Sequence, residues 1–128
     1  MKQRAMTVLL SIKPEFAEKI FNGTKKYEFR KSIFKKTDVK TVVVYASSPV
    51  QRVIGEFTID RILNDDLSTI WDETARESGI THDFYMSYFA NKEKAYAIKI
   101  RNAKRYSQAR KLSDYNIQFA PQSFAYIQ

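Results

Sequence analysis

The hydrophobic pattern changes its period twice within the first thirty residues, and this change limits the folds that the chain can adopt. Residues 6–12 form an apolar run rich in β-formers, which predicts a buried strand. Pro14 and an apolar stripe over 16–21 then predict a helix that ends at Gly23. From residue 26 to residue 30 apolar and charged residues alternate, as in a strand with two unlike faces. The opening of the chain therefore predicts a strand, a helix and a second strand.

The rest of the chain alternates between strand-like and helix-like segments. Apolar β-formers predict strands over 41–46 and 50–62. An acidic middle region predicts one helix capped by Ser68 or Thr69 and another capped by Thr81. Three later segments predict further strands, of which the last two are short: 96–100, 103–106 and 123–127.

Together these segments predict an α+β fold, a small mixed β-barrel of about six strands flanked by about three helices. Strands and helices do not alternate as they do in a doubly wound sheet, and the sequence has no glycine-rich phosphate loop. Gly55, in the middle of the longest predicted strand, indicates a bulge, which is a common device in small barrels. No repeat or linker interrupts the pattern, so we expect a single domain over residues 1–128.

Composition excludes several classes of protein. The chain has no cysteine and only one histidine, so it has nothing with which to build disulfides, a catalytic thiol or a histidine-based zinc site. No apolar run approaches the ~20 residues that span a bilayer. The short apolar stretch near the start is followed too soon by charge to be a signal peptide. We therefore expect a cytoplasmic protein without metal, cofactor or membrane partner.

Charge is distributed unevenly along this basic chain, whose net charge is +8. Residues 1–40 carry 11 basic and 4 acidic side chains, a balance of +7. Residues 41–91 carry 3 and 8, a balance of −5, and residues 92–128 carry 8 and 2, a balance of +6. If the two basic ends meet in the fold, they form one positive face of the kind that binds polyanions. The alternative is a basic protein that scattered lysines keep soluble.

The most informative segment joins the first predicted helix to the strand that follows. In it Glu28 and Arg30 lie two residues apart on one strand face, where a carboxylate and a guanidinium can pair. A partly buried pair would keep Glu28 ionised and hold Arg30 for bidentate recognition of a planar group. The alternative is a solvated strand face with an incidental ion pair worth under about 1 kcal/mol. The spacing alone leaves both interpretations open.

Gly23, Lys25, Glu28 and Arg30 together form a G-x-K-x-x-E-x-R motif. This motif resembles the signature of the ASCH (activating-signal-cointegrator homology) domain, a branch of the PUA-like superfamily. Further segments are similar to the family and lie in the expected order over nearly the whole chain: 10–14, 45–49, 53–57 and 120–124. The resemblance implies a small β-barrel flanked by helices, with a cleft that is lined by the signature and accepts RNA or a nucleotide.

The resemblance, together with local sequence features, also gives a set of candidate binding residues. Lys13 precedes a helix start, where a cation opposes the helix dipole unless an anion shares the site. The serines of the Ser47-Ser48-Pro49 turn are turn residues first, and their position in the family implies a place at the cleft. The full set is Lys13, Lys25, Glu28, Arg30, Ser47, Ser48, Gln122 and Ser123. The RNA or base recognised and the oligomeric state are left open.

Whether the chain is an enzyme is also left open, because members of the family resembled differ in activity. They include RNA-binding modules, ribonucleases and a small bacterial branch that hydrolyses N4-acetylcytidine. In a metal-independent hydrolase of this kind, Lys25 and Glu28 are the candidate catalytic residues. The amidohydrolase branch has a threonine where this chain has Glu28, and Glu56 is the candidate for its downstream glutamate. A third alternative is a protein–protein adaptor that binds neither RNA nor nucleosides.

Aromatic residues gather in the acidic middle of the chain. Four of them repeat at helical spacing over 84–89, which predicts a face that packs in the core rather than a base-stacking surface. Trp71 is expected to be a core residue for the same reason. His82 lies next to the predicted cap at Thr81 and is expected to be exposed and chemically inert.

Overall fold

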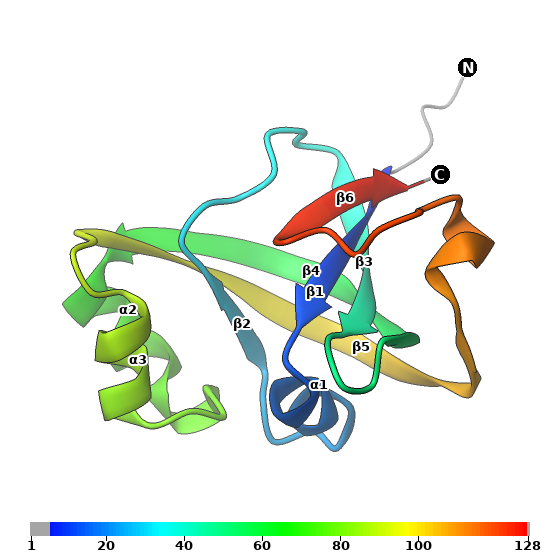
Figure 1. Ribbon diagram of the computed structural model, residues 1–128. Coiled ribbons are helices and arrows are strands. Elements are labelled where there is room, and N and C mark those ends of the chain that lie inside the picture. The colour runs from blue at the N-terminus through cyan, green and yellow to red at the C-terminus, as the bar shows by residue number, and fades with distance from the viewer. Residues whose placement is uncertain (1–5, 128) are drawn as a thin grey trace.

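The computed structural model describes residues 6–127, and over this range the chain forms one mixed sheet with three α-helices and two short 3-10 helices (Figure 1). The strands are β1 (Met6–Ile12), β2 (Tyr27–Arg30), β3 (Val39–Ala46), β4 (Arg52–Asp66), β5 (Lys94–Arg110) and β6 (Phe124–Ile127). The helices are α1 (Pro14–Phe21), α2 (Leu67–Thr74) and α3 (His82–Tyr88), with 3-10 turns η1 (Ala75–Glu77) and η2 (Leu112–Tyr115). The α+β class and the predicted numbers of strands and helices are confirmed.

The six strands lie in the order β2-β5-β4-β3-β1-β6. All neighbouring pairs are antiparallel except β1 and β3, which are parallel. The two outer strands, β2 and β6, are therefore far apart in the hydrogen-bonded order, and backbone pairing does not close the sheet into a barrel. Figure 1 shows the sheet bent so that β2 and β6 both lie on the near side of the long β4–β5 pair. The predicted barrel is in fact a bent, open sheet.

Both faces of the sheet are covered by apolar packing. Alternate residues of β3 point to opposite sides, with Val42 and Val44 in one buried cluster and Val43 and Tyr45 in another. Helix α1 covers the first cluster through Ala17 and its neighbours, and the segment after β5 covers the second. Helices α2 and α3 form a third cluster at the far end of the β4–β5 pair (Figure 1). None of the helices described is long and apolar enough to cross a membrane.

Gly55 confirms the predicted irregularity in β4. The register between β4 and its neighbours shifts between Val53 and Gly55. A Cβ at Gly55 would lie 2.5 Å from the Phe21 ring and 2.6 Å from the Lys104 carbonyl oxygen. Glycine is needed here because α1 and β5 both approach the strand backbone too closely for a side chain.

Several predicted boundaries are wrong. Strand β4 ends at Asp66 and not at residue 62. The start of α2 was missed for a local reason, and the length of β5 for a non-local one. The first turn of α2 is capped by Asp66, whose Oδ1 accepts from the Thr69 N–H at 2.8 Å, and not by Ser68 or Thr69. Strand β5 continues through residues 103–106 instead of leaving them as a separate strand, with Asn102 in a positive-φ conformation (53°) within it. The long partner β4 provides backbone hydrogen bonds along this whole stretch, which no short-range pattern reveals.

Candidate functional site

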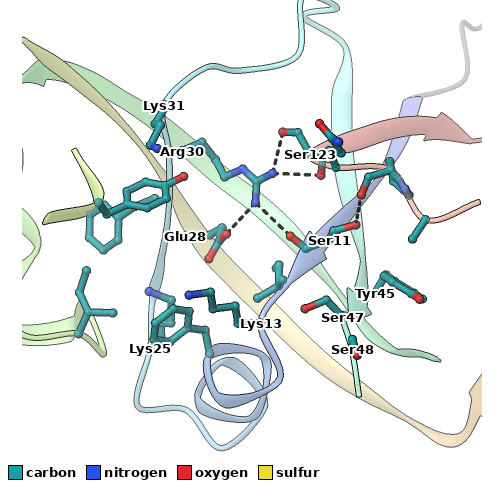
Figure 2. A pocket seen from close by; sticks show the side chains of 18 of the residues that line it. Ser11, Lys13, Lys25, Glu28, Arg30, Lys31, Tyr45, Ser47, Ser48 and Ser123 are labelled. Atoms are coloured by element: carbon teal, nitrogen blue, oxygen red, sulfur yellow. Dashed lines mark hydrogen bonds and ion pairs between the residues drawn. The ribbon is translucent and has the colours of Figure 1, made fainter. Parts of the chain in front are cut away.

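A cleft of about 790 Å³ lies on the side of the sheet where β1, β2, the β3–β4 turn, α3 and the segment before β6 converge (Figure 2). The structure brings all the predicted site residues into its lining: Lys13, Lys25, Glu28, Arg30, Ser47, Ser48, Gln122 and Ser123. These residues come from segments more than a hundred positions apart in sequence. The cleft is thus assembled by tertiary structure and not by one local motif.

Lys25 is the most buried charged residue of the cleft, with 2% of its surface exposed. Its Nζ donates to the carbonyl oxygen of Ser78 at 2.8 Å and lies over two rings, 5.3 Å from the centre of Phe16 and 4.9 Å from that of Phe29. Burial lowers the pKa of Lys25 from 10.5 to about 8, partly offset by the negative charge of Glu28 and reinforced by the positive charge of Lys19. A lysine in this state exchanges its proton much more readily than a solvated one.

Glu28 and Arg30 form a buried ion pair, so the solvated-face interpretation is wrong. Arg30 Nη1 lies 3.1 Å from Glu28 Oε2, and the two side chains are 11% and 8% exposed. The strand parity was predicted correctly: Tyr27 and Phe29 pack in the apolar cluster with α2 and α3, while Glu28 and Arg30 face the cleft. The charged face is enclosed because Ser123 and its neighbours cover it, a contact that strand periodicity does not reveal.

Arg30 connects the two outer parts of the sheet. Its Nη2 donates to the Ser123 carbonyl oxygen at 3.0 Å and to Ser123 Oγ at 2.8 Å, just before β6. Its Nη1 donates to Glu28 and to the Ser11 carbonyl oxygen at 3.3 Å, on β1 (Figure 2). The guanidinium thus holds the open side of the sheet together where no backbone ladder does. Its donors are used mainly within the protein, which indicates that it organises the cleft wall.

Four hydroxyl residues of the cleft lining were not predicted as site residues: Ser11, Ser32, Tyr45 and Tyr88. Two of them, Ser11 and Tyr45, lie on neighbouring strands. Tyr45, which is 4% exposed, lines the cleft directly before the Ser47-Ser48 turn. Ser11 pairs with Tyr45 in the parallel register and donates from Oγ to the Pro121 carbonyl oxygen at 2.6 Å. Both belong to the segments that resemble the ASCH family, and that membership is the signal that can point to them.

Helix α3 carries aromatic residues on two faces, so the prediction of a purely core-packing face is only half right. Tyr85 and Phe89 are fully buried against Phe29. Phe84 and Tyr88, on the other hand, are half-buried and line the cleft. Neighbouring lysine ammonium groups lie over both rings: Lys13 at 5.6 Å from the centre of Phe84, and Lys31 at 4.7 Å from that of Tyr88.

Trp71 packs against the core and His82 is exposed, as predicted. Trp71 is half-buried and packs against Tyr85, with ring centres 4.8 Å apart. His82 is exposed and borders Trp71 at 5.2 Å. Neither residue lines the cleft.

Glu56 does not lie in the cleft. It accepts a hydrogen bond from the Tyr106 hydroxyl at 2.8 Å, next to a different hollow of the surface. Among the described residues that line the cleft, Glu28 is the only carboxylate. The second carboxylate that the amidohydrolase alternative requires is therefore not supplied by Glu56.

The cleft is cationic on balance. Its lining contains four cationic side chains, those of Lys13, Lys25, Arg30 and Lys31, against the single carboxylate of Glu28. Lys13 and Lys31 are exposed at the rim of the cleft, while Lys25 and Arg30 are buried in its wall. An anionic group entering the cleft thus meets exposed charges first and buried charges deeper inside.

Comparison with known proteins assigns this fold and site to a family. The family model "ASCH domain" matches residues 10–104, and the chain belongs to the ASCH domain family. The solved structure of ASCH from Zymomonas mobilis superposes with a TM-score of 0.85 at 30% identity, covering 98% of this chain and 90% of that chain.

Two curated relatives are similar to this chain in sequence. An ASCH domain-containing ribonuclease of Zymomonas mobilis subsp. mobilis is 35% identical over 94 residues, covering 73% of this chain and 64% of the relative. The large ribosomal subunit protein uL22 of Ureaplasma parvum serovar 3 is 32% identical over 125 residues, covering 94% of this chain. The chain spans only 39% of the length of that ribosomal relative, so the similarity concerns one part of it.

Proposed function

We propose that the cleft binds a nucleotide of single-stranded RNA. The observation that carries the proposal is the combination, around one hollow, of four cationic side chains with two half-buried aromatic rings on α3. The rim lysines bind phosphates, and the half-buried rings stack on unpaired bases. Together these are the two features of a single-strand binding site.

The inner wall of the cleft supplies groups that distinguish one nucleotide from another. Arg30 contacts Glu28 through Oε2, and within residues 6–127 no hydrogen bond is formed to Glu28 Oε1. That oxygen is an acceptor for an exocyclic amino group or a ribose hydroxyl. Tyr45 and Ser47 line the opposite side of the cleft, where Ser47 adds a hydroxyl group (Figure 2).

RNA is the ligand class that the comparisons favour. The relative from Zymomonas mobilis that matches at 35% identity is named as a ribonuclease. Because the chain covers 64% of that relative, we extend from it only the class of ligand and not its activity.

The test is the binding of fluorescently labelled single-stranded RNA, measured by anisotropy at several salt concentrations. If about four phosphates are neutralised, affinity falls roughly fifty-fold between about 50 and 200 mM salt, from a slope near −0.7 per phosphate. The double variant Lys13→Gln with Lys31→Gln removes two rim charges, and we expect its slope to be smaller by about 1.4.

A matched control removes the same charge elsewhere. Lys92→Gln with Lys94→Gln changes two exposed lysines at the turn between α3 and β5, outside the cleft. We expect this variant to bind RNA with the affinity and salt slope of the unmodified protein. Equal losses in both double variants, or binding that ignores salt, would refute the proposal.

Metal-independent cleavage of RNA is the second candidate, because Lys25 combines burial in the cleft with a pKa of about 8. At pH 7.5 about a quarter of such amines are neutral and able to accept a proton. Neutral Lys25 Nζ would take the proton of a ribose 2′-hydroxyl while its oxygen attacks the adjacent phosphorus. The P–O5′ bond breaks, water protonates the leaving 5′-oxygen, and the products are a 2′,3′-cyclic phosphate and a 5′-hydroxyl.

Incubation of RNA with the protein in EDTA tests this candidate. We expect a cyclic-phosphate product that disappears when the reacting 2′-hydroxyl is replaced by hydrogen. Lys25→Met abolishes the product, whereas Lys92→Met, which changes an exposed lysine outside the cleft lining, does not. RNA that binds but stays intact would reject cleavage and leave the binding proposal in place.

A further inference from the structure

A second hollow, of about 590 Å³, lies beside the last part of β5 and the 3-10 turn η2. Its lining includes Lys104, Arg110 and Lys111, together with Ser107 and Gln108. This segment is the most basic of the chain: residues 99–111 contain six lysine or arginine residues and no acidic residue. The hollow is separate from the cleft described above, with which it shares no lining residue.

The basic residues of β5 divide into paired and unpaired groups. Lys99 and Arg101 lie 3.7 and 3.9 Å from the carboxylate of Asp60, and Arg105 pairs with Glu18. Within residues 6–127, the three that line the second hollow, Lys104, Arg110 and Lys111, take part in no ion pair. Apart from Lys94 at the start of β5, the unpaired cations of this strand and of the residue that follows it therefore lie at this hollow.

The Arg110 side chain is held in one position by contacts with two tyrosines. Its guanidinium lies 3.8 Å from the ring centre of Tyr106 and donates from Nη1 to the Tyr115 hydroxyl at 3.0 Å. Tyr106 is itself fixed by its hydrogen bond to Glu56. A stacked guanidinium keeps its remaining donors pre-organised, which suits the fork of a phosphate group.

Sheet geometry places this hollow next to the cleft. Tyr45 of the cleft pairs with Val53 on β4, and Val53 pairs with Arg110 on β5. Residues that pair directly share a sheet face, so Tyr45 and Arg110 lie in one cross-strand row. Two strand spacings separate their backbones, about 10 Å. Figure 1 likewise shows the end of β5 close to the β3–β4 turn that borders the cleft.

We propose that the second hollow binds the ribose–phosphate backbone of RNA that continues out of the cleft. The inference rests on the proposed function, because it extends the same strand beyond the bound nucleotide. Lys104, Arg110 and Lys111 contact phosphates and read no base, so they add affinity without adding sequence preference. The acidic side chain of Asp114, also in the lining, accepts from the Lys111 backbone N–H at 3.0 Å and is thus turned to the chain itself.

RNA length separates this inference from the proposed function. We would compare a labelled trinucleotide with a twelve-residue single strand, using the variant Lys104→Gln with Lys111→Gln. We expect trinucleotide binding to be unchanged and the salt slope for the longer RNA to be smaller by about 1.4, as two phosphate contacts are lost. The control variant Lys92→Gln with Lys94→Gln, at the other end of β5, leaves both RNAs unaffected.

Each other outcome has a definite meaning. If the unmodified protein binds neither RNA, the proposed function fails and this inference falls with it. If it binds both with equal affinity, or if the Lys104 and Lys111 changes have no effect on the longer RNA, only the inference is overturned. Loss of binding to polyglutamate in this variant, with RNA binding intact, would assign the hollow to an acidic protein partner and overturn it too.

Discussion

Lys25 shows how one side chain can be charged and still lie inside the protein. Its ammonium group has one carbonyl acceptor and two aromatic faces in place of water. These contacts compensate burial only in part, which is why its pKa falls to about 8. The residue therefore contributes a pH-dependent term to stability as well as a group for chemistry.

The sign of that term follows from the two pKa values. The pKa of Lys25 is about 8 in the folded protein and 10.5 in the unfolded chain. Between pH 8 and pH 10.5 the unfolded chain therefore binds more protons than the folded protein. Folding then becomes more favourable as pH rises from 8 to 10.5, by about 3 kcal/mol in total. Below pH 8 both states carry the proton and the term is constant.

We expect urea unfolding to detect this difference against the variant Lys25→Met, in which the other titrating groups are retained. The stability of the unmodified protein relative to the variant should increase between pH 8 and pH 10.5 and stay level between pH 6.5 and pH 7.5. Two stability curves that run parallel over the whole range would show that Lys25 has an ordinary pKa.

The sequence identified most of the charged residues that line the cleft, but fewer of its hydroxyl and aromatic residues. The G-x-K-x-x-E-x-R motif pointed to Lys25, Glu28 and Arg30, and all three line the cleft. Tyr45 and Phe84 were missed as lining residues because a buried tyrosine and a helical phenylalanine look the same whether they border a core or a hollow. Only the tertiary placement of α3 against β2 separates these cases.

Elements were predicted well where the pattern is local. β1, α1, β2 and α3 fall within a residue or two of their predicted bounds, since period, proline and capping residues define them. The length of β5 was underestimated because its second half is polar and is held by pairing to β4, an interaction between distant parts of the chain.

The crossing of α1 over β4 depends on the missing side chain at Gly55. Alanine at this position would place Cβ 2.5 Å from the Phe21 ring and 2.6 Å from a β5 carbonyl oxygen. We expect Gly55→Ala to lower the free energy of unfolding by about 1–3 kcal/mol, because overpacking forces the layers apart. Chemical denaturation of the variant measures the loss.

A double-mutant cycle shows whether the helix contact is the cause. Phe21→Ala removes the ring that the new Cβ meets, so Gly55→Ala with Phe21→Ala should lose less stability than the two single changes added together. Gly23→Ala, whose Cβ has nothing within 4 Å, should show no such coupling to Phe21. Additive losses in the Gly55 cycle would argue against a clash with α1.

At the scale of the whole molecule, the Arg30 guanidinium links the two outer parts of the open sheet. Arg30, on one outer strand, bonds to β1 and to the segment before the other outer strand. The fold class was predictable from the order of the elements, whereas this closure was not, because it joins segments that no periodicity relates.

We expect Arg30→Gln to cost about 3–5 kcal/mol, since it leaves the Glu28 carboxylate buried without a partner. Glu28→Gln with Arg30→Gln should cost less than Arg30→Gln alone, because no buried charge remains. Urea unfolding of the three proteins provides the comparison.

An exposed ion pair serves as the control for the stability cost of Arg30→Gln. Arg105 and Glu18 are 45% and 59% exposed, against 11% and 8% for Arg30 and Glu28. Arg105→Gln should therefore cost under about 1 kcal/mol. A similar cost for the two arginine variants would mean that Arg30 does not hold the sheet.

The bond between Arg30 and Ser123 joins positions 93 residues apart. A ribosome releases a chain from its beginning, at about 5–20 residues per second. Residues 120–123, which form one wall of the cleft, emerge only after residues 6–119 have been made. A nascent chain thus contains Lys13 and Lys25 for some seconds before the cleft that they line is complete. A new molecule can therefore hold a ligand in the cleft only after residues 120–123 have been made.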